Sequence, residues 1–323
     1  MINGELIDLR AGDYEARVAT SGAALVHLRK AGRELIIPFD AEASLPGAWR
    51  GKTLAPWPNR IVGARYTYWG ASYLVPCNEP ETGSALHGLV GWADFQVTAV
   101  TGAEETGAGG VPASSATLGL TLPASYAYPW SLEIDVRFAL DARTGLTVTA
   151  TATGLGAGVS PAPGVVGAPE ADGRLAPAPY GVSFHPYLTR SVPLDECILQ
   201  VPAARVLDVD ERMAPAAERD VTGTDWDWRA GRLVRRIATD NAYTGLPQGP
   251  WEIRLTGGEA GRTVVMSAEA PWVQIYTAEH LGRRGVAVEP MTCPPDAFNS
   301  GRDLVELQAG QSHSFAYSLR EEE

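Results

Sequence analysis

The sequence predicts an all-β protein that folds as one large β-sandwich. Most of the chain consists of short runs that alternate in polarity or are rich in β-branched and aromatic residues, with Gly, Pro, Asn and Asp between them. No long segment shows helical periodicity. The 323 residues are 45% hydrophobic and 20% charged, a composition that supplies a substantial core. Many short strands separated by turns favour a sandwich or a barrel.

Each expected strand follows from its own residues. In the first half of the chain, alternation or β-branched content predicts strands at 14–20 (YEARVAT), 24–32 (ALVHLRKAG), 66–75 (YTYWGASYLV), 94–100 (DFQVTAV), 116–122 (ATLGLTL), 131–140 (SLEIDVRFAL) and 145–153 (GLTVTATAT). In the second half, the same features predict strands at 251–257 (WEIRLTG), 262–268 (RTVVMSA), 272–279 (WVQIYTAE), 285–290 (GVAVEP) and 313–319 (HSFAYSL). Since no clear linker divides these runs, we expect a single domain over residues 1–323.

Two segments differ from the strands. Residues 101–115 are polar and rich in glycine and lie between two expected strands, so we expect the tip of a hairpin. Residues 154–179 are rich in Gly, Ala and Pro, which predicts a flexible surface loop. A domain linker is the alternative for the second segment, but the strand-like runs on either side would then have to form separate cores.

Charge and cysteine content limit the choice of partners and compartment. The formal net charge is −12 and the chain contains no basic tract, which argues against a nucleic-acid partner. Cys77, Cys197 and Cys293 lie far apart without CxxC or zinc spacing, so a reduced protein is expected. No signal peptide is evident, and no apolar stretch approaches the roughly 20 residues of a membrane helix. We expect a cytoplasmic protein with no membrane partner, either a monomer or a homodimer.

The stretch YGVSFHPYL, residues 180–188, places a histidine directly before a proline. Read with a period of two, the bulky residues at 180, 182 and 184 share one face, and Gly181, Ser183 and His185 share the other. Pro186 cannot donate to a strand ladder, so His185 is expected at or near a strand end, with small neighbours that leave room beside it. For an isolated histidine, a ring satisfied by a backbone carbonyl is the alternative.

Glu289 repeats this arrangement in GVAVEPMTCPPDAFNSG, residues 285–301. The carboxylate follows the small residue Ala287 on the polar face of the expected strand, and Pro290 then interrupts the strand. Pro294 and Pro295 stiffen the loop beyond it, which can fix a catalytic side chain. An edge-strand charge that discourages aggregation is the alternative, and the residues alone do not separate the two.

Four more polar residues are candidates for the same site. Asn59 and Arg60 follow two prolines in LAPWPNRIVG, His87 precedes a glycine in SALHGLVGW, and Asp240 stands in ATDNAYTGL. Three of these four residues have an ordinary structural alternative. Arg60 could be an ion-pair partner, His87 could cap a turn, and Asp240 could form a turn.

These motifs resemble those of a known family. The segments PWPNRIVGARYTYWGASYLVP, ALHGLV, FHPYL, TDNAYTGL and above all AVEPMTCPPDAFNSG are similar to the aldose 1-epimerases, also called galactose mutarotases, of the bacterial subgroup with HPY and EPMT motifs. The resemblance covers nearly the whole chain and implies a large antiparallel β-sandwich of the galactose mutarotase-like type with an open sugar cleft. It also implies an isomerase that interconverts the α and β anomers of free aldohexoses without a cofactor. The segment 154–179 looks like an insertion relative to the family pattern.

The resemblance implies that Glu289 is the general base and His185 the general acid of this reaction. Proton removal from the C1 hydroxyl and proton delivery to the ring oxygen would open the ring. We expect partial burial to raise the pKa of Glu289 towards neutrality while His185 stays largely protonated at rest. No local ligand spacing supports a metal site built from His87, His185 and Glu289, so we expect no metal.

The resemblance further implies that Asn59, Arg60, His87 and Asp240 bind the substrate.

Two other functions are compatible with the sequence. A non-catalytic sugar-binding module could dispense with an acid–base pair, which the chain nevertheless carries. A hexose-6-phosphate 1-epimerase with the same sandwich would need a cationic cluster, for which the chain offers Arg65, Arg283, Arg284 and Arg302.

Overall fold

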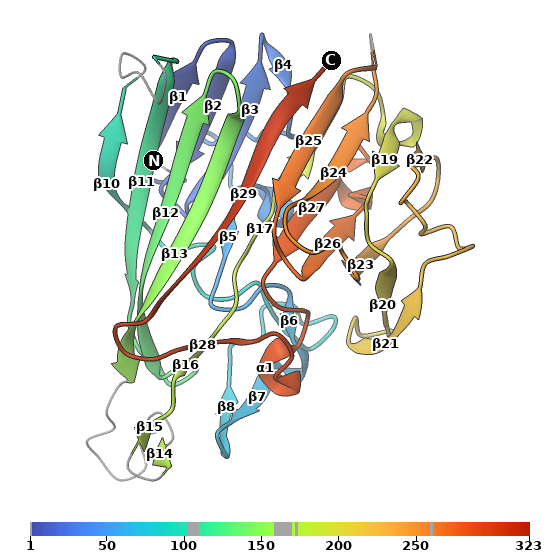
Figure 1. The fold of residues 1–323 in the computed structure, drawn as a ribbon. Coiled ribbons are helices and arrows are strands. Elements are labelled where there is room, and N and C mark those ends of the chain that lie inside the picture. The colour runs from blue at the N-terminus through green and yellow to red at the C-terminus, as the bar shows by residue number, and fades with distance from the viewer. Residues whose placement is uncertain (1, 103–109, 158–169, 172–173, 259–260) are drawn as a thin grey trace.

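The structure is a computed structural model that describes residues 2–102, 110–157, 170–171, 174–258 and 261–323. Nearly all regular structure in these ranges is β-strand in antiparallel sheets, which confirms the predicted fold class (Figure 1). Within the described ranges the one α-helix is the single turn α1 (Ala297–Ser300), and the 3₁₀ turns are Gly47–Trp49, Val62–Ala64, Leu194–Glu196 and Glu279–Leu281. No helix in this part of the chain is long and apolar enough to cross a membrane.

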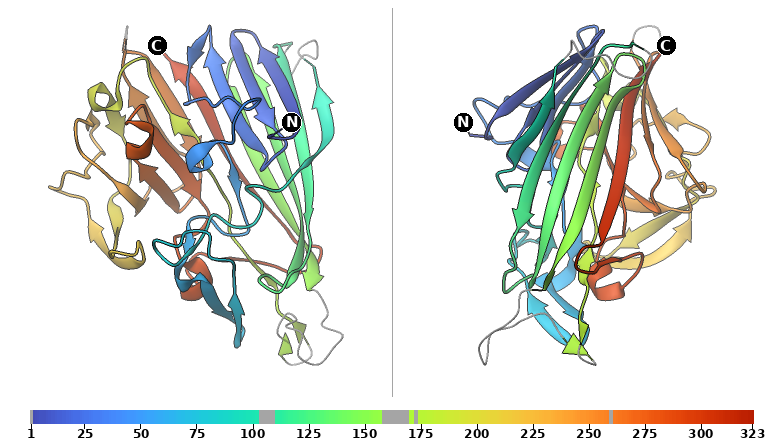
Figure 2. Two further views of the ribbon diagram at one scale, coloured as in Figure 1. Left: turned by 180° about the vertical axis from the view of Figure 1, so that it is seen from behind. Right: turned by 60° about the vertical axis from the view of Figure 1, so that its left-hand side comes forward.

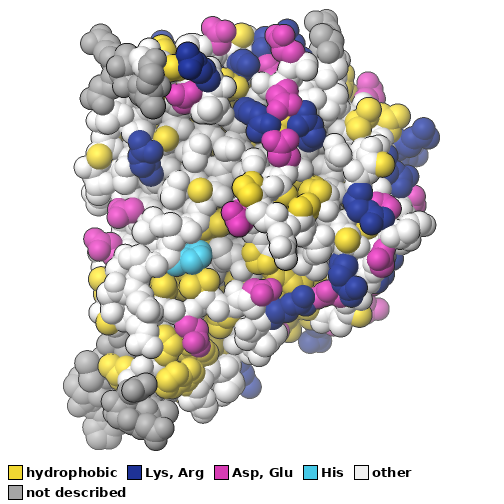
Figure 3. Space-filling model, in the orientation of Figure 1, with side chains coloured by type: hydrophobic (Ala, Val, Ile, Leu, Met, Phe, Trp, Pro, Cys, Tyr) yellow, Lys and Arg dark blue, Asp and Glu magenta, His cyan; other side chains and the backbone are white. Residues whose placement is uncertain are grey.

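The widest layer is a nine-stranded sheet. Its strands, in spatial order, are β10 (Gln96–Thr101), β11 (Ala113–Leu122), β12 (Trp130–Asp141), β13 (Gly145–Ala157), β29 (Ser312–Glu322), β25 (Thr263–Ala268), β24 (Trp251–Thr256), β19 (Ile198–Gln200) and β22 (Arg232–Leu233). The C-terminal strand β29 pairs with both β13 and β25 and so joins the two halves of the sheet. Ion pairs on β24 and β29 join Arg254, Arg320, Glu252 and Glu322. Figure 3 shows basic and acidic side chains scattered over the face seen in Figure 1, with some of opposite charge in contact.

Two further sheets lie behind this layer (Figures 1 and 2). The four-stranded sheet consists of β1 (Leu6–Ala11), β2 (Tyr14–Ala19), β3 (Ala24–Lys30) and β4 (Arg33–Glu34). The eight-stranded sheet runs in the order β21 (Pro215–Asp220), β20 (Arg205–Val209), β23 (Asp240–Thr244), β26 (Trp272–Tyr276), β27 (Val286–Met291), β17 (Ser183–Phe184) and β5 (Thr53–Leu54), and its eighth strand, β18 (Tyr187–Leu188), also pairs with β27.

Short strand pairs complete the fold. They are β6 (Arg60–Ile61) with β9 (Ala85–Leu86), β7 (Arg65–Tyr68) with β8 (Ala71–Leu74), β14 (Glu170–Ala171) with β15 (Arg174–Leu175), and β16 (Ala178–Tyr180) with β28 (Val305–Leu307). The run 66–75, predicted as one strand, is therefore a hairpin, because Trp69 and Gly70 both take positive φ and turn the chain.

The two predicted loops are only partly described. Strands β10 and β11 pair antiparallel, as expected for a hairpin, and the connecting residues 103–109 lie outside the described residues. In the predicted loop 154–179, residues 154–157 extend β13 and residues 178–179 belong to β16. Residues 158–169 and 172–173, which would decide the loop's behaviour, also lie outside the described residues.

The core is formed by the alternating faces of the strands. One buried cluster of apolar side chains extends from Ile7 in β1 to Leu319 in β29 and draws on all three large sheets. In β27, Val286 and Val288 belong to this cluster, whereas Ala287 packs in a different buried cluster. Because successive side chains of a strand point to opposite faces, Glu289 projects on the same side as Ala287, away from the main core.

Candidate active site

His185 lies where β17 meets the segment before β5. Its N–H donates to the carbonyl of Lys52 (3.0 Å), and its carbonyl accepts from the N–H of Gly51 (2.9 Å), which continues the pairing of β17 with β5. Pro186 cannot donate, and after it the chain pairs through β18 with β27 instead. The predicted alternation is confirmed, since residues 180, 182 and 184 join the main core and His185 lies on the opposite face.

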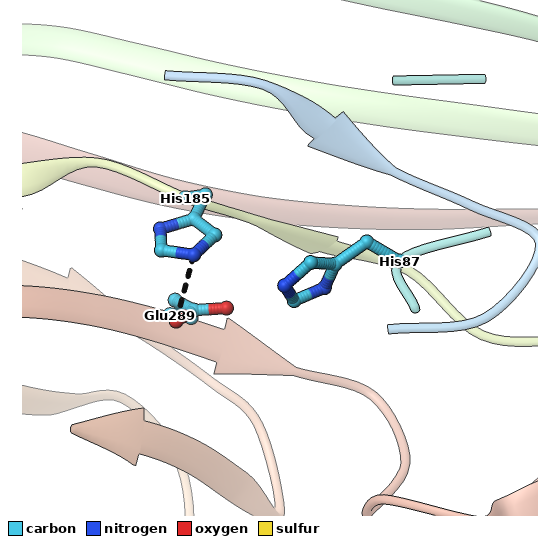
Figure 4. Close-up of side chains that lie close together, drawn as sticks. All are labelled: His87, His185 and Glu289. Carbon is cyan, nitrogen blue, oxygen red and sulfur yellow. Dashed lines mark ion pairs between the residues drawn. The ribbon is translucent and has the colours of Figure 1, made fainter. Parts of the chain in front are cut away.

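Glu289 lies opposite His185 on the neighbouring strand. The register pairs Ser183 with Met291 and Tyr187 with Ala287, which brings the residues between them together. His185 Nε2 is 3.3 Å from Glu289 Oε1 (Figure 4). The two side chains are only 6% and 2% exposed. Two residues that are distant in the sequence therefore form one buried imidazole–carboxyl pair.

A second histidine, His87, stands beside this pair (Figure 4), with its ring centroid 5.3 Å from that of His185. It arrives through the short pairing of β6 with β9, which sets Asn59 against His87. The N–H of His87 donates to the Asn59 carbonyl (2.7 Å), and the N–H of Asn59 donates to His87 Nδ1 (3.2 Å). Gly88 follows with φ +73°, and a Cβ there would lie 2.1 Å from the carbonyl oxygen of Ala55, so this turn requires glycine.

The bond from Asn59 fixes the tautomer of His87. A backbone N–H can only donate, so Nδ1 is the acceptor and the proton of the neutral ring is on Nε2. Burial, together with the charges of His185 and Arg60, lowers the pKa of His87 well below its ordinary value and keeps the ring neutral. His87 is therefore a hydrogen-bond donor at this site.

This tautomer also decides whether the cluster suits a metal ion. His87, His185 and Glu289 each offer one ligand atom, and these atoms lie within 4.8 Å of one another. A metal-bound imidazole donates its second N–H to an acceptor. His87 Nδ1 instead receives a hydrogen bond, which leaves the proton on Nε2 and no lone pair for a cation. The donor set does not fit a metal centre.

Arg60 is held in the site by a buried carboxylate. Its Nε and Nη2 atoms donate to the two oxygens of Glu79, both at 2.7 Å, and the two side chains are 10% and 11% exposed. Burial alone would raise the pKa of Glu79, but hydrogen bonds from Arg60 and Thr82 lower it below its ordinary value. The Nη1 atom of Arg60 donates to the side-chain oxygen of Asn59 (3.3 Å), so the guanidinium is fixed in direction.

We expect Glu79→Gln to destabilise the fold by about 3–5 kcal/mol, because it leaves the buried guanidinium of Arg60 without its counter-charge. Urea unfolding monitored by tryptophan fluorescence measures this change. The double variant Arg60→Met/Glu79→Met is the control, since it removes both charges and should lose less stability than Glu79→Gln. Equal or greater loss in the double variant would contradict a charge-pairing role for Glu79.

Asp240 opens strand β23 rather than forming a turn. It pairs in register with Tyr276, and Gln274 Nε2 donates to its Oδ1 at 2.7 Å. Burial raises the pKa of Asp240, and the charge of Arg60 and the bond from Gln274 oppose this rise. Gln274 itself pairs in register with Glu289, so β23, β26 and β27 present Asp240, Gln274 and Glu289 in sequence across one sheet face.

Three buried polar atoms of this cluster have no hydrogen-bond partner in the described structure, namely His185 Nδ1, Glu289 Oε2 and Gln274 Oε1. Leaving a buried polar group unsatisfied costs roughly 1–3 kcal/mol. Such orphaned atoms within one cluster indicate a place that a polar ligand completes.

Burial shifts both members of the pair towards their neutral forms. It lowers the pKa of His185 to about 3 and raises the pKa of Glu289 well above its ordinary value, with a further rise from the charge of Asp240. The expected rise for Glu289 is confirmed. The expectation that His185 stays protonated at rest is wrong, because the buried imidazole cannot be hydrated as a cation. Both shifts favour the state in which the pair holds one proton and the carboxyl keeps it.

The structure brings all six predicted residues, Asn59, Arg60, His87, His185, Asp240 and Glu289, into one region, where the charge of Arg60 acts on Asp240 and on Glu289.

Three neighbouring residues of the site were not predicted from the sequence. Gln274 could have been noticed as a polar residue between aromatic ones in WVQIY. Tyr187 stacks on the ring of His185 at 4.9 Å, and Glu79 holds Arg60; neither carries a local sequence signal.

An antiparallel β-sandwich with a buried carboxyl–imidazole pair flanked by an arginine, a second histidine and an aspartate defines the class of protein. The family model described as aldose 1-epimerase matches residues 5–162 and 170–320. The chain belongs to the aldose 1-epimerase family, and this membership implies an isomerase.

The chain is also similar to a protein of known sequence and, in its fold, to solved structures. The chain is 37% identical over 318 residues to the Escherichia coli K12 protein YihR, described as uncharacterized, covering 98% of this chain and 93% of that protein. The fold is similar to a GalM/aldose epimerase homologue from C. elegans, with a TM-score of 0.80, 20% identity and 98% of each chain covered. It is also similar to a galactose 1-epimerase from Lactobacillus acidophilus NCFM, with a TM-score of 0.78, 16% identity and 100% and 99% covered.

Proposed function

We propose that this protein interconverts the α and β anomers of free aldohexoses by acid–base ring opening and reclosure. The observation that carries the proposal is the buried pair of His185 and Glu289, 3.3 Å apart, with one unpartnered polar atom on each side chain. A sugar-binding module needs hydroxyl-binding residues but no such pair. An anomerase needs both a proton acceptor and a proton donor at one place.

The single proton of the pair is sufficient for the reaction. Its transfer from Glu289 to His185 gives a carboxylate and an imidazolium without any exchange with solvent. The carboxylate then takes the proton of the C1 hydroxyl, while the imidazolium gives its proton to the ring oxygen and the C1–O5 bond breaks. After rotation about C1–C2, attack of the C5 hydroxyl on the other face of the aldehyde reverses both transfers. The pair ends with the one proton it began with.

The remaining residues hold the sugar in place for this transfer. Arg60 is a fixed donor, His87 donates through Nε2, and Asp240 accepts, so both kinds of hydroxyl contact are available. Gln274 Oε1 adds an acceptor beside Glu289. Positioning of the substrate against the catalytic pair supplies part of the rate enhancement.

The pKa shifts predict an unusual pH profile. With ordinary pKa values of about 4.3 for Glu and 6.5 for His, the reactive pair would exist only between these values, and activity would fall below about pH 4.3. Burial raises the pKa of Glu289 and lowers that of His185 to about 3, so the one-proton pair persists below that limit. We expect kcat/KM to stay level from about pH 5.5 down to about pH 4. A fall in kcat/KM that begins at about pH 4.3 would contradict this protonation scheme.

Polarimetry on freshly dissolved sugars tests the proposed function. Free α-glucose, α-galactose and related aldoses are run beside their 6-phosphates, and we expect acceleration with the free sugars. Acceleration confined to the phosphates would instead indicate a hexose-6-phosphate 1-epimerase. Of the arginines that such an enzyme could use, Arg283 is paired with Asp195 and Glu279, and Arg302 with Glu218. Binding without acceleration would indicate a non-catalytic module.

A further inference from the structure

A second concentration of charge lies where β4, β29 and the segment after β18 meet. Arg33, Arg190 and Arg262 come from distant parts of the chain and share one carboxylate, Glu321, at 2.5, 3.0 and 3.6 Å. The side chains of Glu321 and Arg190 are 1% and 4% exposed. Because a carboxylate balances only one guanidinium, this cluster carries positive charge in excess, in a protein whose net charge is −12.

The cluster opens onto two adjoining hollows of about 640 and 840 Å³, both lined by Arg33, Arg190, Ser191 and Val192. Arg284 lines the first hollow and is exposed. Within the described residues, its guanidinium has neither an ion-pair nor a hydrogen-bond partner. The unpaired guanidinium of Arg284 therefore lines the same hollow as Arg33 and Arg190, whose charges Glu321 balances only in part.

Acidic side chains offset part of this excess, since Glu323 and Asp13 act on Arg33 from outside the hollows. Of the carboxylates that line the hollows, Glu34 is paired with Arg29, outside the cluster, and Glu196 lies at the second hollow. Arg283, which also lines the first hollow, is already neutralised by its own carboxylate partners. The first hollow also has apolar walls, Ile37, Pro38, Val192 and Pro193. Its chemistry suits an anionic group attached to a small carbon skeleton.

The hollow is distinct from the sugar site. Ile37 packs with Tyr187 and Ala287 in one buried cluster, and Tyr187 stacks on the ring of His185. This apolar layer stands between the catalytic pair and the arginines. Of the residues that line the first hollow, those nearest to these strands in the sequence are Thr189, after β18, and Arg284, before β27, and none of the lining residues belongs to the sugar site.

We propose that the arginine-lined hollow binds a small molecule carrying a phosphate group. Guanidinium groups match tetrahedral oxyanions through paired hydrogen bonds, and a phosphate dianion supplies the negative charge that the cluster lacks. Ser191 adds a hydroxyl donor at the boundary of the two hollows. The ligand class is either inorganic phosphate or a phosphate monoester.

Isothermal titration of the full chain with inorganic phosphate at low ionic strength tests this site. We expect saturable binding that weakens with added salt, and a loss of about tenfold in affinity for Arg284→Ala, since a hydrogen bond to a charged group is removed. Arg284 is exposed and unpaired, so this variant should fold. Arg137→Ala is the matched control, because Arg137 is an exposed arginine on the nine-stranded sheet.

Two results would overturn the proposal. One is the absence of saturable phosphate binding, or equal binding by wild type and Arg284→Ala. The other is displacement of phosphate by an aldohexose or its loss in Glu289→Gln, either of which would place the anion at the sugar site. Titration with glycerol phosphate separates the two sources: tighter binding than inorganic phosphate assigns a monoester, whereas equal or weaker binding shows that the carbon skeleton adds nothing and assigns the free ion.

Discussion

We expect Glu289→Gln to lower kcat for anomer exchange by about 10²–10⁴-fold, because an amide cannot take the C1 hydroxyl proton. Burial raises the pKa of this carboxyl and so favours its neutral form, and glutamine is also neutral and has nearly the same shape. The melting temperature should therefore stay close to that of the wild type. Polarimetry at saturating sugar gives kcat, and thermal unfolding gives the stability.

Glu133→Gln is the matched control for this variant. Glu133 is an exposed residue of β12, on the nine-stranded sheet, and the same isosteric change there should leave kcat unaltered. If Glu289→Gln retained kcat within a few-fold of the wild type while Glu133→Gln behaved as expected, Glu289 would not be the base.

The second large effect is expected for His185→Asn. Asparagine can still donate a hydrogen bond but cannot hold and release the proton that the ring oxygen needs, so kcat should fall by about 10²–10⁴-fold. Sugar binding should change much less, because Arg60, His87 and Asp240 remain. Measuring kcat and the sugar dissociation constant separately distinguishes a lost acid from a lost binding contact.

A histidine outside the site controls for the substitution itself. His313 lies on β29 and is partly buried, and His313→Asn should keep full activity. Loss of sugar affinity in His185→Asn with kcat nearly unchanged would assign His185 to binding rather than to proton transfer.

The sequence contains enough information for the fold and for the two central residues. Period-two alternation ahead of Pro186 and Pro290 places His185 and Glu289 on the faces that the structure shows. Strands β12, β13 and β29 are long and alternate clearly, so their assignment needs no tertiary information.

Other parts of the site depend on long-range contacts that leave no local pattern. Asn59 meets His87 through strands of only two residues, β6 and β9, which no periodicity can reveal. Asp240 reads as a turn former in TDN, yet pairing with β26 makes it the first residue of a strand. The neutral state of His185 also could not be predicted, because it follows from nearly complete burial.

Exchange spectroscopy by NMR on an aldohexose at anomeric equilibrium is the decisive measurement of proton transfer by Glu289 and His185. It records transfer of magnetisation between the α and β anomeric protons without any net reaction. We expect transfer well above the buffer rate with the wild type, and a return to near the buffer rate with both Glu289→Gln and His185→Asn. Wild-type protein that binds the sugar yet leaves the exchange rate at the buffer value would contradict this expectation.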